Sequence, residues 1–196
     1  MPISMDQGRN KNVKKDEFSR TIGVWQLIRG DVKRYKNIGE AITKLGFYAT
    51  LFYRVSHCLY KRGLTWLARF VQLLSHIITG TEISHRAVIG PGLGLLHPTA
   101  VMIGPRVQIG KAATICQSVT ISSNHLNGDE GPTIGDHFWA GPGCVVMGPI
   151  FLGEGVWVGP NAVLLRSVQS YMNVQGNPAR VFPREAFQRS SSKLAL

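Results

Sequence analysis

Two histidines stand where a regular sequence repeat is interrupted, and both are candidates for catalysis. His97 lies in LLHPTAVMIG, and His125 lies in the polar stretch SSNHLNGDEGPT. An imidazole titrates near neutral pH, so it can remove a proton from a hydroxyl group that attacks an acyl donor. His97 is the better candidate, since a histidine in a polar loop more often faces solvent. An imidazole that only fills a corner of the fold is the alternative for His97.

The spacing of the other histidines argues against a metal site. Within the repeat region the histidines are His85, His97, His125 and His137, each at least twelve residues from the next. A metal hydratase would need several imidazoles in one cluster. We therefore expect no metal, and we assign no role to His57, His76, His85 or His137.

The elements that must position these candidates repeat every six residues. An aliphatic residue recurs at thirteen positions, and glycine follows it at seven of them. This period is typical of a parallel β-helix, in which each hexapeptide supplies one short strand and a corner. Three hexapeptides make one coil of about 18 residues, so about four coils are predicted. The positions are Ile83, Ile89, Leu95, Ile103, Ile109, Ile115, Ile121, Ile134, Ala140, Val146, Leu152, Val158 and Leu164.

Before the repeat, the apolar residues have helical spacing. They recur at intervals of three and four from Trp25 to about Ile78, with a break at Arg62 and Gly63, which predicts three or four helices. We therefore expect a mobile polar arm at 1–20, a helical segment at 21–80 and a β-helix at 81–170. The β-helix carries an excursion loop at 122–133, and residues 171–196 form a tail.

Charge and cysteine content limit the classes of protein. Residues 1–80 hold 14 basic and 5 acidic residues, against 8 and 6 in residues 81–196. The basic helical segment suits either contact with a membrane surface or a solvated face. No module that reads nucleic acid is recognisable. Three cysteines cannot form a closed disulfide set, no apolar stretch is long enough to span a membrane, and the first 20 residues are polar. We expect a cytoplasmic protein, with the inner face of the membrane as an option.

From about Ile28 to Val181 the chain resembles the serine acetyltransferases and their relatives among the left-handed β-helix acyltransferases. LARFVQLLSHIITGTEI is similar to the family's helix that leads into the first coil, and LLHPTAVMIG to its catalytic segment. ATICQSVTI and VQGNPARVF are similar to two later segments, in the same order. The resemblance implies the left hand of the coil, acetyl-CoA as co-substrate, and a homotrimer in which trimers can pair through the N-terminal helices.

The resemblance also implies roles for single residues. His97 falls on the general base, and Glu82, fifteen residues earlier, falls where the family keeps an aspartate that orients this histidine. We expect polar residues of the loop, Asn124, His125 and Asp129, to orient the acceptor. The contacts expected for acetyl-CoA are Ser122, Ser123, Gly141, Pro142, Gly159, Pro160 and Arg180, with Arg184 as a second phosphate partner.

Three departures from the family pattern bear on the acceptor. Leu96, Glu130 and Gly131 stand where the family holds the two charges of an amino acid. An unpaired charge in a partly desolvated cleft is unfavourable. We therefore expect an O-acetyltransferase that acts on a sugar hydroxyl of a surface polysaccharide or its precursor. Serine O-acetylation in cysteine biosynthesis is the alternative.

The sequence also bears on two further classes of protein. A non-catalytic β-helix scaffold is the alternative if His97 is inert. A nucleotide-sugar transferase with a hexapeptide tail is excluded, because the residues before the repeat leave no room for a nucleotide-binding domain.

Overall fold

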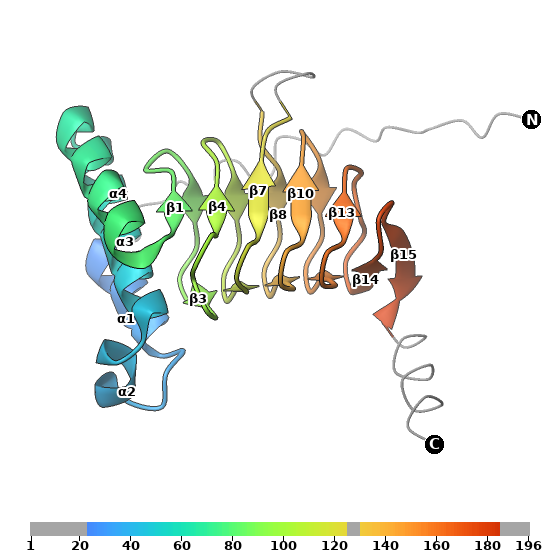
Figure 1. Ribbon diagram of the computed structural model, residues 1–196, viewed down its shortest axis with the longest axis horizontal. Coiled ribbons are helices and arrows are strands. Elements are labelled where there is room, and N and C mark those ends of the chain that lie inside the picture. The colour runs from blue at the N-terminus through green and yellow to red at the C-terminus, as the bar shows by residue number, and fades with distance from the viewer. Residues whose placement is uncertain (1–22, 125–129, 185–196) are drawn as a thin grey trace, which may run out of the picture.

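The computed structural model describes residues 23–124 and 130–184, which form helices followed by a prism of short strands (Figure 1). The helices α1 (Val24–Val32), α2 (Ile38–Ile42), α3 (Leu45–Lys61) and α4 (Thr65–Thr79) gather at one end of the prism. Gly80 ends α4 in the left-handed conformation, with φ 66°, a common helix stop that glycine adopts without strain. The predicted arm at 1–20 lies outside the described residues.

The strands stack into three flat sheets that form the sides of the prism. Sheet A has the order β1-β4-β7-β10-β13, sheet B the order β11-β8-β5-β2, and sheet C the order β15-β14-β12-β9-β6-β3. All pairs are parallel except β14 with β15. The strands are β1 (Glu82–Ile83), β2 (Val88–Ile89), β3 (Gly94–Leu95), β4 (Met102–Ile103), β5 (Gln108–Ile109), β6 (Thr114–Ile115), β7 (Thr120–Ser122), β8 (Thr133–Ile134), β9 (Trp139–Ala140), β10 (Val145–Met147), β11 (Phe151–Leu152), β12 (Trp157–Val158), β13 (Val163–Leu164), β14 (Met172–Gln175) and β15 (Arg180–Pro183).

The strand register reproduces both interruptions of the repeat. Strands of uninterrupted neighbouring coils pair at an offset of 18 residues, as in Ile103 with Ile121. The first coil pairs with the second at an offset of 20, as in Ile83 with Ile103. Pairs that span the excursion loop have an offset of 25, as in Ile109 with Ile134. The extra residues are therefore extruded at two corners, while the strands on either side stay aligned.

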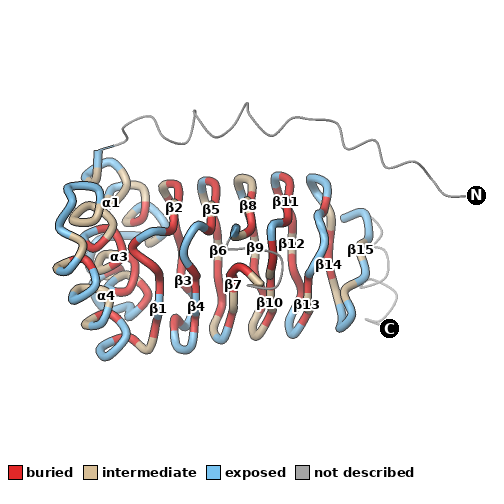
Figure 2. Tube along the Cα trace, turned by 90° about the horizontal axis from the view of Figure 1, so that it is seen from above, coloured by how far each residue is buried: buried red, intermediate tan, exposed pale blue. Residues whose placement is uncertain are grey.

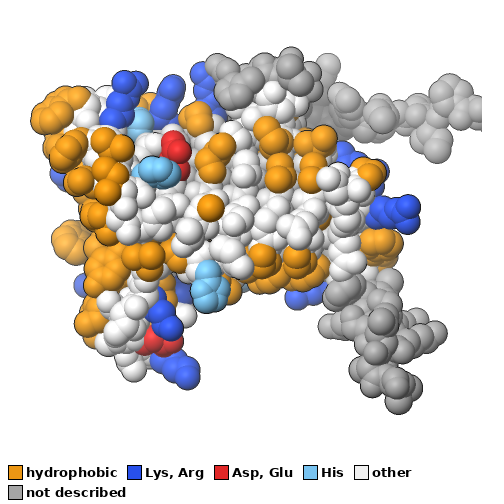
Figure 3. Space-filling view, in the orientation of Figure 1, with side chains coloured by type: hydrophobic (Ala, Val, Ile, Leu, Met, Phe, Trp, Pro, Cys, Tyr) orange, Lys and Arg blue, Asp and Glu red, His pale blue; other side chains and the backbone are white. Residues whose placement is uncertain are grey.

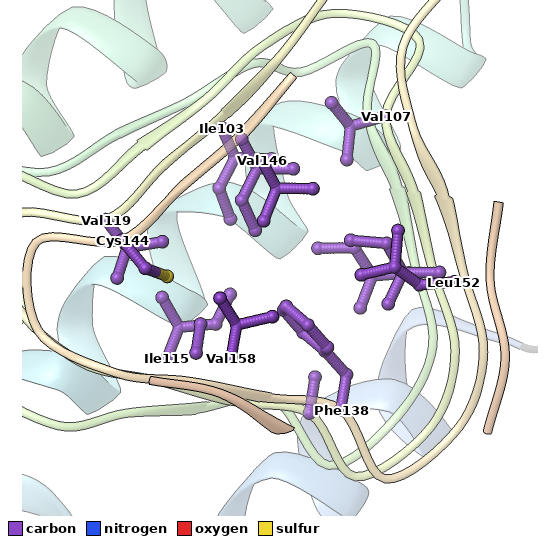
Figure 4. Packing of buried hydrophobic residues seen from close by; sticks show 14 of the residues in the cluster. Ile103, Val107, Ile115, Val119, Phe138, Cys144, Val146, Leu152 and Val158 are labelled. Atoms are coloured by element: carbon purple, nitrogen blue, oxygen red, sulfur yellow. The ribbon is translucent and has the colours of Figure 1, made fainter. Parts of the chain in front are cut away.

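The interior of the prism is a column of mainly aliphatic side chains, and most hexapeptides contribute two of them, as with Ile103 and Val107 (Figure 4). Seen from above, the coils are buried along most of their length (Figure 2). The corners take a fixed backbone shape, because Ala100, Arg106, Ala112 and Ser118 all have φ between 55° and 60°. These four left-handed corners lie six residues apart, so the corner conformation repeats with the sequence period.

The helices close the end of the first coil through a buried polar cluster. Arg54 donates to both carboxylate oxygens of Asp31, at 2.8 and 3.1 Å, and to the carbonyl oxygens of Ile89 and Gly90. The Tyr53 hydroxyl donates to the carbonyl oxygen of Ala87 and accepts the N–H of Ile89. The open edge of the first coil is therefore covered by groups that match its backbone donors and acceptors.

The strands continue past residue 170, within the segment predicted as a tail. β14 adds to sheet C beside β12 in parallel, and β15 folds back on it. Val174 is fully buried, so this segment completes the packing of the last coil. Among the described residues, no helix is long and apolar enough to cross a membrane.

Candidate active site

His97 lies at the first of the two interruptions, in the corner between β3 and β4. Its backbone is left-handed, with φ 55°, and its side chain is exposed. The corner is fastened to the residues before β1: the Thr81 hydroxyl donates to the carbonyl oxygen of Pro98 at 2.7 Å, and the N–H of Ala100 donates to the carbonyl oxygen of Gly80. The imidazole is therefore presented to solvent on an anchored backbone.

Glu82 begins β1, close in the fold to this corner, because Thr81 precedes it and contacts Pro98. Its side chain is exposed, and its Oε1 accepts a weak hydrogen bond of 3.5 Å from Nε2 of Gln72. Within the described ranges, no hydrogen bond joins Glu82 to His97. The structure thus brings their backbone segments together and gives the Glu82 carboxylate a different partner, on α4.

The corner segments predicted to bind acetyl-CoA stack on the same edge of the prism as His97. All lie between a strand of sheet C and the next strand of sheet A. The N–H of Ser118 donates to Thr99 at 3.0 Å, and the N–H of Gly143 donates to Gln117 at 3.0 Å. The N–H of Asn161 then donates to Pro142 at 2.9 Å. These corners form an unbroken series, which runs from the corner that holds His97 to the corner that holds Gly159 and Pro160. We call this series the C/A edge.

Two stacked tryptophans border this edge on sheet C. The rings of Trp139 and Trp157 lie 4.6 Å apart and 8° from parallel. A Cβ at Gly141 would approach the Trp139 ring to 2.9 Å, and one at Gly159 would approach the Trp157 ring to 3.1 Å. Glycine at both corners therefore leaves room for the rings beside the C/A edge.

The other predicted contacts lie elsewhere on the prism. Ser122 and Ser123 are buried and Asn124 is half-buried, at the corner where sheet A leads to sheet B. This corner is on the opposite edge of sheet A from His97. Arg180 and Arg184 are exposed at the far end from the helices. His125 and Asp129 lie outside the described residues.

A second group of polar side chains was missed from the sequence. Arg69, Gln72 and His76 of α4 line a pocket with Glu82 and His85. Helical spacing alone places the first three on α4. Only the docking of α4 against the first coil brings them to the segment after β1. The sequence held a weak signal, the polar stretch Ser84 to Arg86 at the first corner.

His85 is the most altered ionisable group of this pocket. The residue is 6% exposed, and burial is the main cause that lowers the pKa of its imidazole, followed by the charges of Arg69 and Arg86. Burial likewise lowers the pKa of His57, whose Nδ1 contacts the carbonyl oxygen of His85 at 2.9 Å. Burial thus favours the neutral form of both rings.

In the described part of the chain, no three His, Cys, Asp or Glu side chains are arranged to hold a metal ion.

Comparisons with known proteins agree with this architecture. No family model matches the chain. The serine acetyltransferase of Helicobacter pylori is 36% identical over 141 residues, which are 71% of this chain and 82% of that protein. Several longer serine acetyltransferases are matched over 57% to 67% of their length.

Solved structures give the same relationship. A serine acetyltransferase from Brucella abortus in complex with coenzyme A has a TM-score of 0.78 and 28% identity, over 86% of this chain and 71% of that one. The Neisseria gonorrhoeae serine acetyltransferase in complex with serine has a TM-score of 0.76 and 27% identity, over 80% and 68%. The predicted fold, N-terminal helices followed by a left-handed parallel β-helix, is confirmed.

Proposed function

Because the chain belongs to the serine acetyltransferase family of acetyl-CoA-dependent O-acetyltransferases, we propose that it transfers the acetyl group of acetyl-CoA to the hydroxyl of L-serine, with His97 as the general base. The observation that carries the proposal is the C/A edge. It holds an exposed imidazole in the first coil, in line with the corner segments expected to contact the co-substrate.

The expectation of a sugar acceptor is wrong. The relatives at 36% identity are serine acetyltransferases, and one of the similar structures holds serine. The expectation rested on Leu96, Glu130 and Gly131, which lack the charges that the family uses for the amino acid. These three departures say nothing about the groups that other elements bring to the acceptor, so they are too weak a basis for replacing serine by a neutral ligand.

The proposed reaction is a direct transfer. The imidazole of His97 accepts the proton of the serine hydroxyl while the oxygen attacks the thioester carbonyl carbon. A backbone N–H near the corner stabilises the negative oxygen of the tetrahedral intermediate. The C–S bond then breaks, and the imidazolium returns the proton to the coenzyme A thiolate. Glu82 stabilises the imidazolium by its negative charge.

The dimensions of the prism suit an extended co-substrate. Successive coils are separated by about 4.8 Å, so Gly141 lies two coils, or about 10 Å, from the corner of His97. Gly159 lies one coil further. A pantetheine arm laid along the C/A edge would reach these corners with its thioester at His97. Arg180 and Arg184, at the far end of the prism, are the cations we assign to the phosphates.

We propose a homotrimer, because one chain does not bring the proposed contacts together. Ser122, Ser123 and Asn124 lie on the opposite edge of sheet A from His97. They can contact the same co-substrate only if the corresponding edge of a second chain lies beside the C/A edge.

Pairing of trimers would use the helices. Hydrophobic side chains gather over the helical end of the molecule (Figure 3). Trp66, Phe70, Leu73 and Ile77 form one stripe of α4, and each is more than half exposed. A contiguous apolar stripe of this kind marks an interaction surface. Light scattering would report a particle of three chains, or of six chains when the stripes of two trimers pair. Replacing Trp66 and Phe70 by serine should convert a particle of six chains into particles of three.

The activity is tested by release of coenzyme A thiol from acetyl-CoA, with L-serine and a panel of sugars offered in parallel and the acetylated product identified by mass spectrometry. We expect L-serine to drive release. His97→Ala should lower turnover at least about a hundredfold, the usual scale for loss of a general base, and His125→Ala should lower it much less. Release driven by a sugar and not by serine would contradict the acceptor, and an active His97→Ala enzyme would contradict the base.

A further inference from the structure

Arg34 reaches from the turn after α1 to the strand that leads into the His97 corner. The end of α1 is fastened there, because Asp31 Oδ1 accepts the N–H of Gly92, just before β3, at 2.9 Å. The Arg34 guanidinium then lies over Gly94 of β3: a Cβ at Gly94 would be 3.0 Å from Nε and 3.1 Å from Nη2. Glycine at this position therefore makes room for the guanidinium on the outer face of sheet C.

In the described part of the chain, the Arg34 guanidinium has no acidic partner. Its Nη2 donates to the hydroxyl of Thr114 in the next coil, which is a neutral group. The ion pair within the described residues joins Arg54 to Asp31 and does not include Arg34. Thr114 thus fixes the position of a positive charge on sheet C. The remaining N–H groups of the guanidinium are available to a ligand.

This charge lies close to the proposed reaction centre. The N–H of Leu96 donates to the carbonyl oxygen of Ile115 at 2.8 Å, so the chain stays aligned with the next coil past the end of β3. Side chains two residues apart lie on one face of a strand, so the exposed Leu96 is the neighbour of Gly94 on that face. His97 follows, and three extended residues span at most about 10 Å. An acceptor of the size of serine is therefore long enough to contact the side chains of Arg34 and His97 together.

We infer that Arg34 binds the carboxylate of the acceptor and makes the enzyme select a hydroxyl compound that carries one. The inference rests on the proposed acetylation of L-serine and names the residue that confers this selectivity. Glu130, at one of the positions where the family holds the charges of the amino acid, would repel a carboxylate. Arg34 supplies the opposite charge from another element, and a guanidinium can donate two parallel hydrogen bonds to one carboxylate.

The phosphates of acetyl-CoA are a poor alternative for this cation. With the thioester at His97, the co-substrate extends toward the far end of the prism, where Arg180 and Arg184 are exposed. Arg34 comes from the helical end and lies over the first coil. The group that it meets is therefore part of the acceptor.

L-Serinamide separates this contact from the rest of catalysis, because it keeps the hydroxyl and amino groups of L-serine and replaces the carboxylate by a neutral amide. In the thiol-release assay, the wild type should have a KM for L-serine at least about tenfold below its KM for L-serinamide. Arg34→Met should raise the KM for L-serine at least about tenfold, with kcat within about threefold of wild type. The same variant should change the KM for L-serinamide by less than about twofold.

Two further variants test the position of the charge. Gly94→Ala keeps the Arg34 side chain and places a methyl group where the guanidinium lies, so it should raise the KM for L-serine as Arg34→Met does. Lys33→Met removes an exposed cation one residue earlier and should leave both KM values within about twofold of wild type. Far-ultraviolet circular dichroism checks that each variant is folded.

The outcomes distinguish the inference from the proposed function. If the wild type acetylates L-serine and Arg34→Met leaves its KM within about twofold, the inference alone is overturned. Equal rises for L-serine and L-serinamide, or equal effects of Arg34→Met and Lys33→Met, would overturn it as well, because they indicate a general effect of structure or net charge. If the wild type releases no thiol with L-serine, both the proposed function and the inference are wrong.

Discussion

Replacing Asp31 by alanine should lower the free energy of unfolding by about 3–5 kcal/mol, because it leaves the charge of Arg54 buried without a counter-charge. The two side chains are 3% and 1% exposed and lie 2.8 Å apart. Asp31 Oδ1 also accepts the N–H groups of Gly92 and Leu93, each at 2.9 Å. The substitution therefore removes the counter-charge and two backbone contacts of the first coil at once, which favours the upper part of the range.

Urea unfolding, followed by tryptophan fluorescence and far-ultraviolet circular dichroism, measures the loss. The double variant Asp31→Leu/Arg54→Met should be more stable than Asp31→Ala, since no charge then stays buried. Arg62→Met is the control: Arg62 is an exposed cation after α3, and its replacement should change the stability by less than about 0.5 kcal/mol. A loss below about 1 kcal/mol for Asp31→Ala, or a double variant no more stable than the single one, would refute the reasoning.

Three further experiments probe the docking of the helices and the packing of the coils. Gly46→Ala should destabilise strongly in urea unfolding, because its Cβ would collide with the carbonyl oxygen of Leu95. Burial raises the pKa of Tyr53 from 10.0 to about 12. The contribution of the neutral Tyr53 side chain to the free energy of unfolding is therefore complete below pH 10 and is lost as the pH rises toward 12. Tyr53→Phe should therefore flatten the fall of stability over that range. A double-mutant cycle of Trp139 and Trp157 to alanine should give a coupling energy of about 0.5–1.5 kcal/mol.

The β-helix could be predicted from the sequence because its core is periodic. Each hexapeptide carries the aliphatic residue of its own strand, so residues of the interior recur in the sequence at intervals of six. The two interruptions were visible for the same reason, and the structure shows them as register offsets of 20 and 25 residues in place of 18. The hand of the coil is not contained in the period and came from the resemblance.

The pocket between α4 and the first coil could not be predicted in this way. Gln72 and His85 are thirteen residues apart on different elements, and their contact depends on how α4 docks against the coil. The prediction of a sugar as the acceptor was wrong for a related reason. Leu96, Glu130 and Gly131 report which family contacts are missing, but a chain can supply charges to a ligand from any element that the fold brings near.

The two-residue excess before Ile103 has a structural consequence that explains why His97 is accessible. The strands on both sides of this corner keep their register, since Leu95 pairs with Ile115 and Ile103 with Ile121. The extra residues therefore cannot enter the prism and must bulge outward. In the next coil Cys116, which follows the strand as Leu96 does here, is 6% exposed, whereas Leu96 is 50% exposed. The insertion thus lifts the imidazole out of an otherwise packed edge, as the proposed reaction with a thioester along the C/A edge requires.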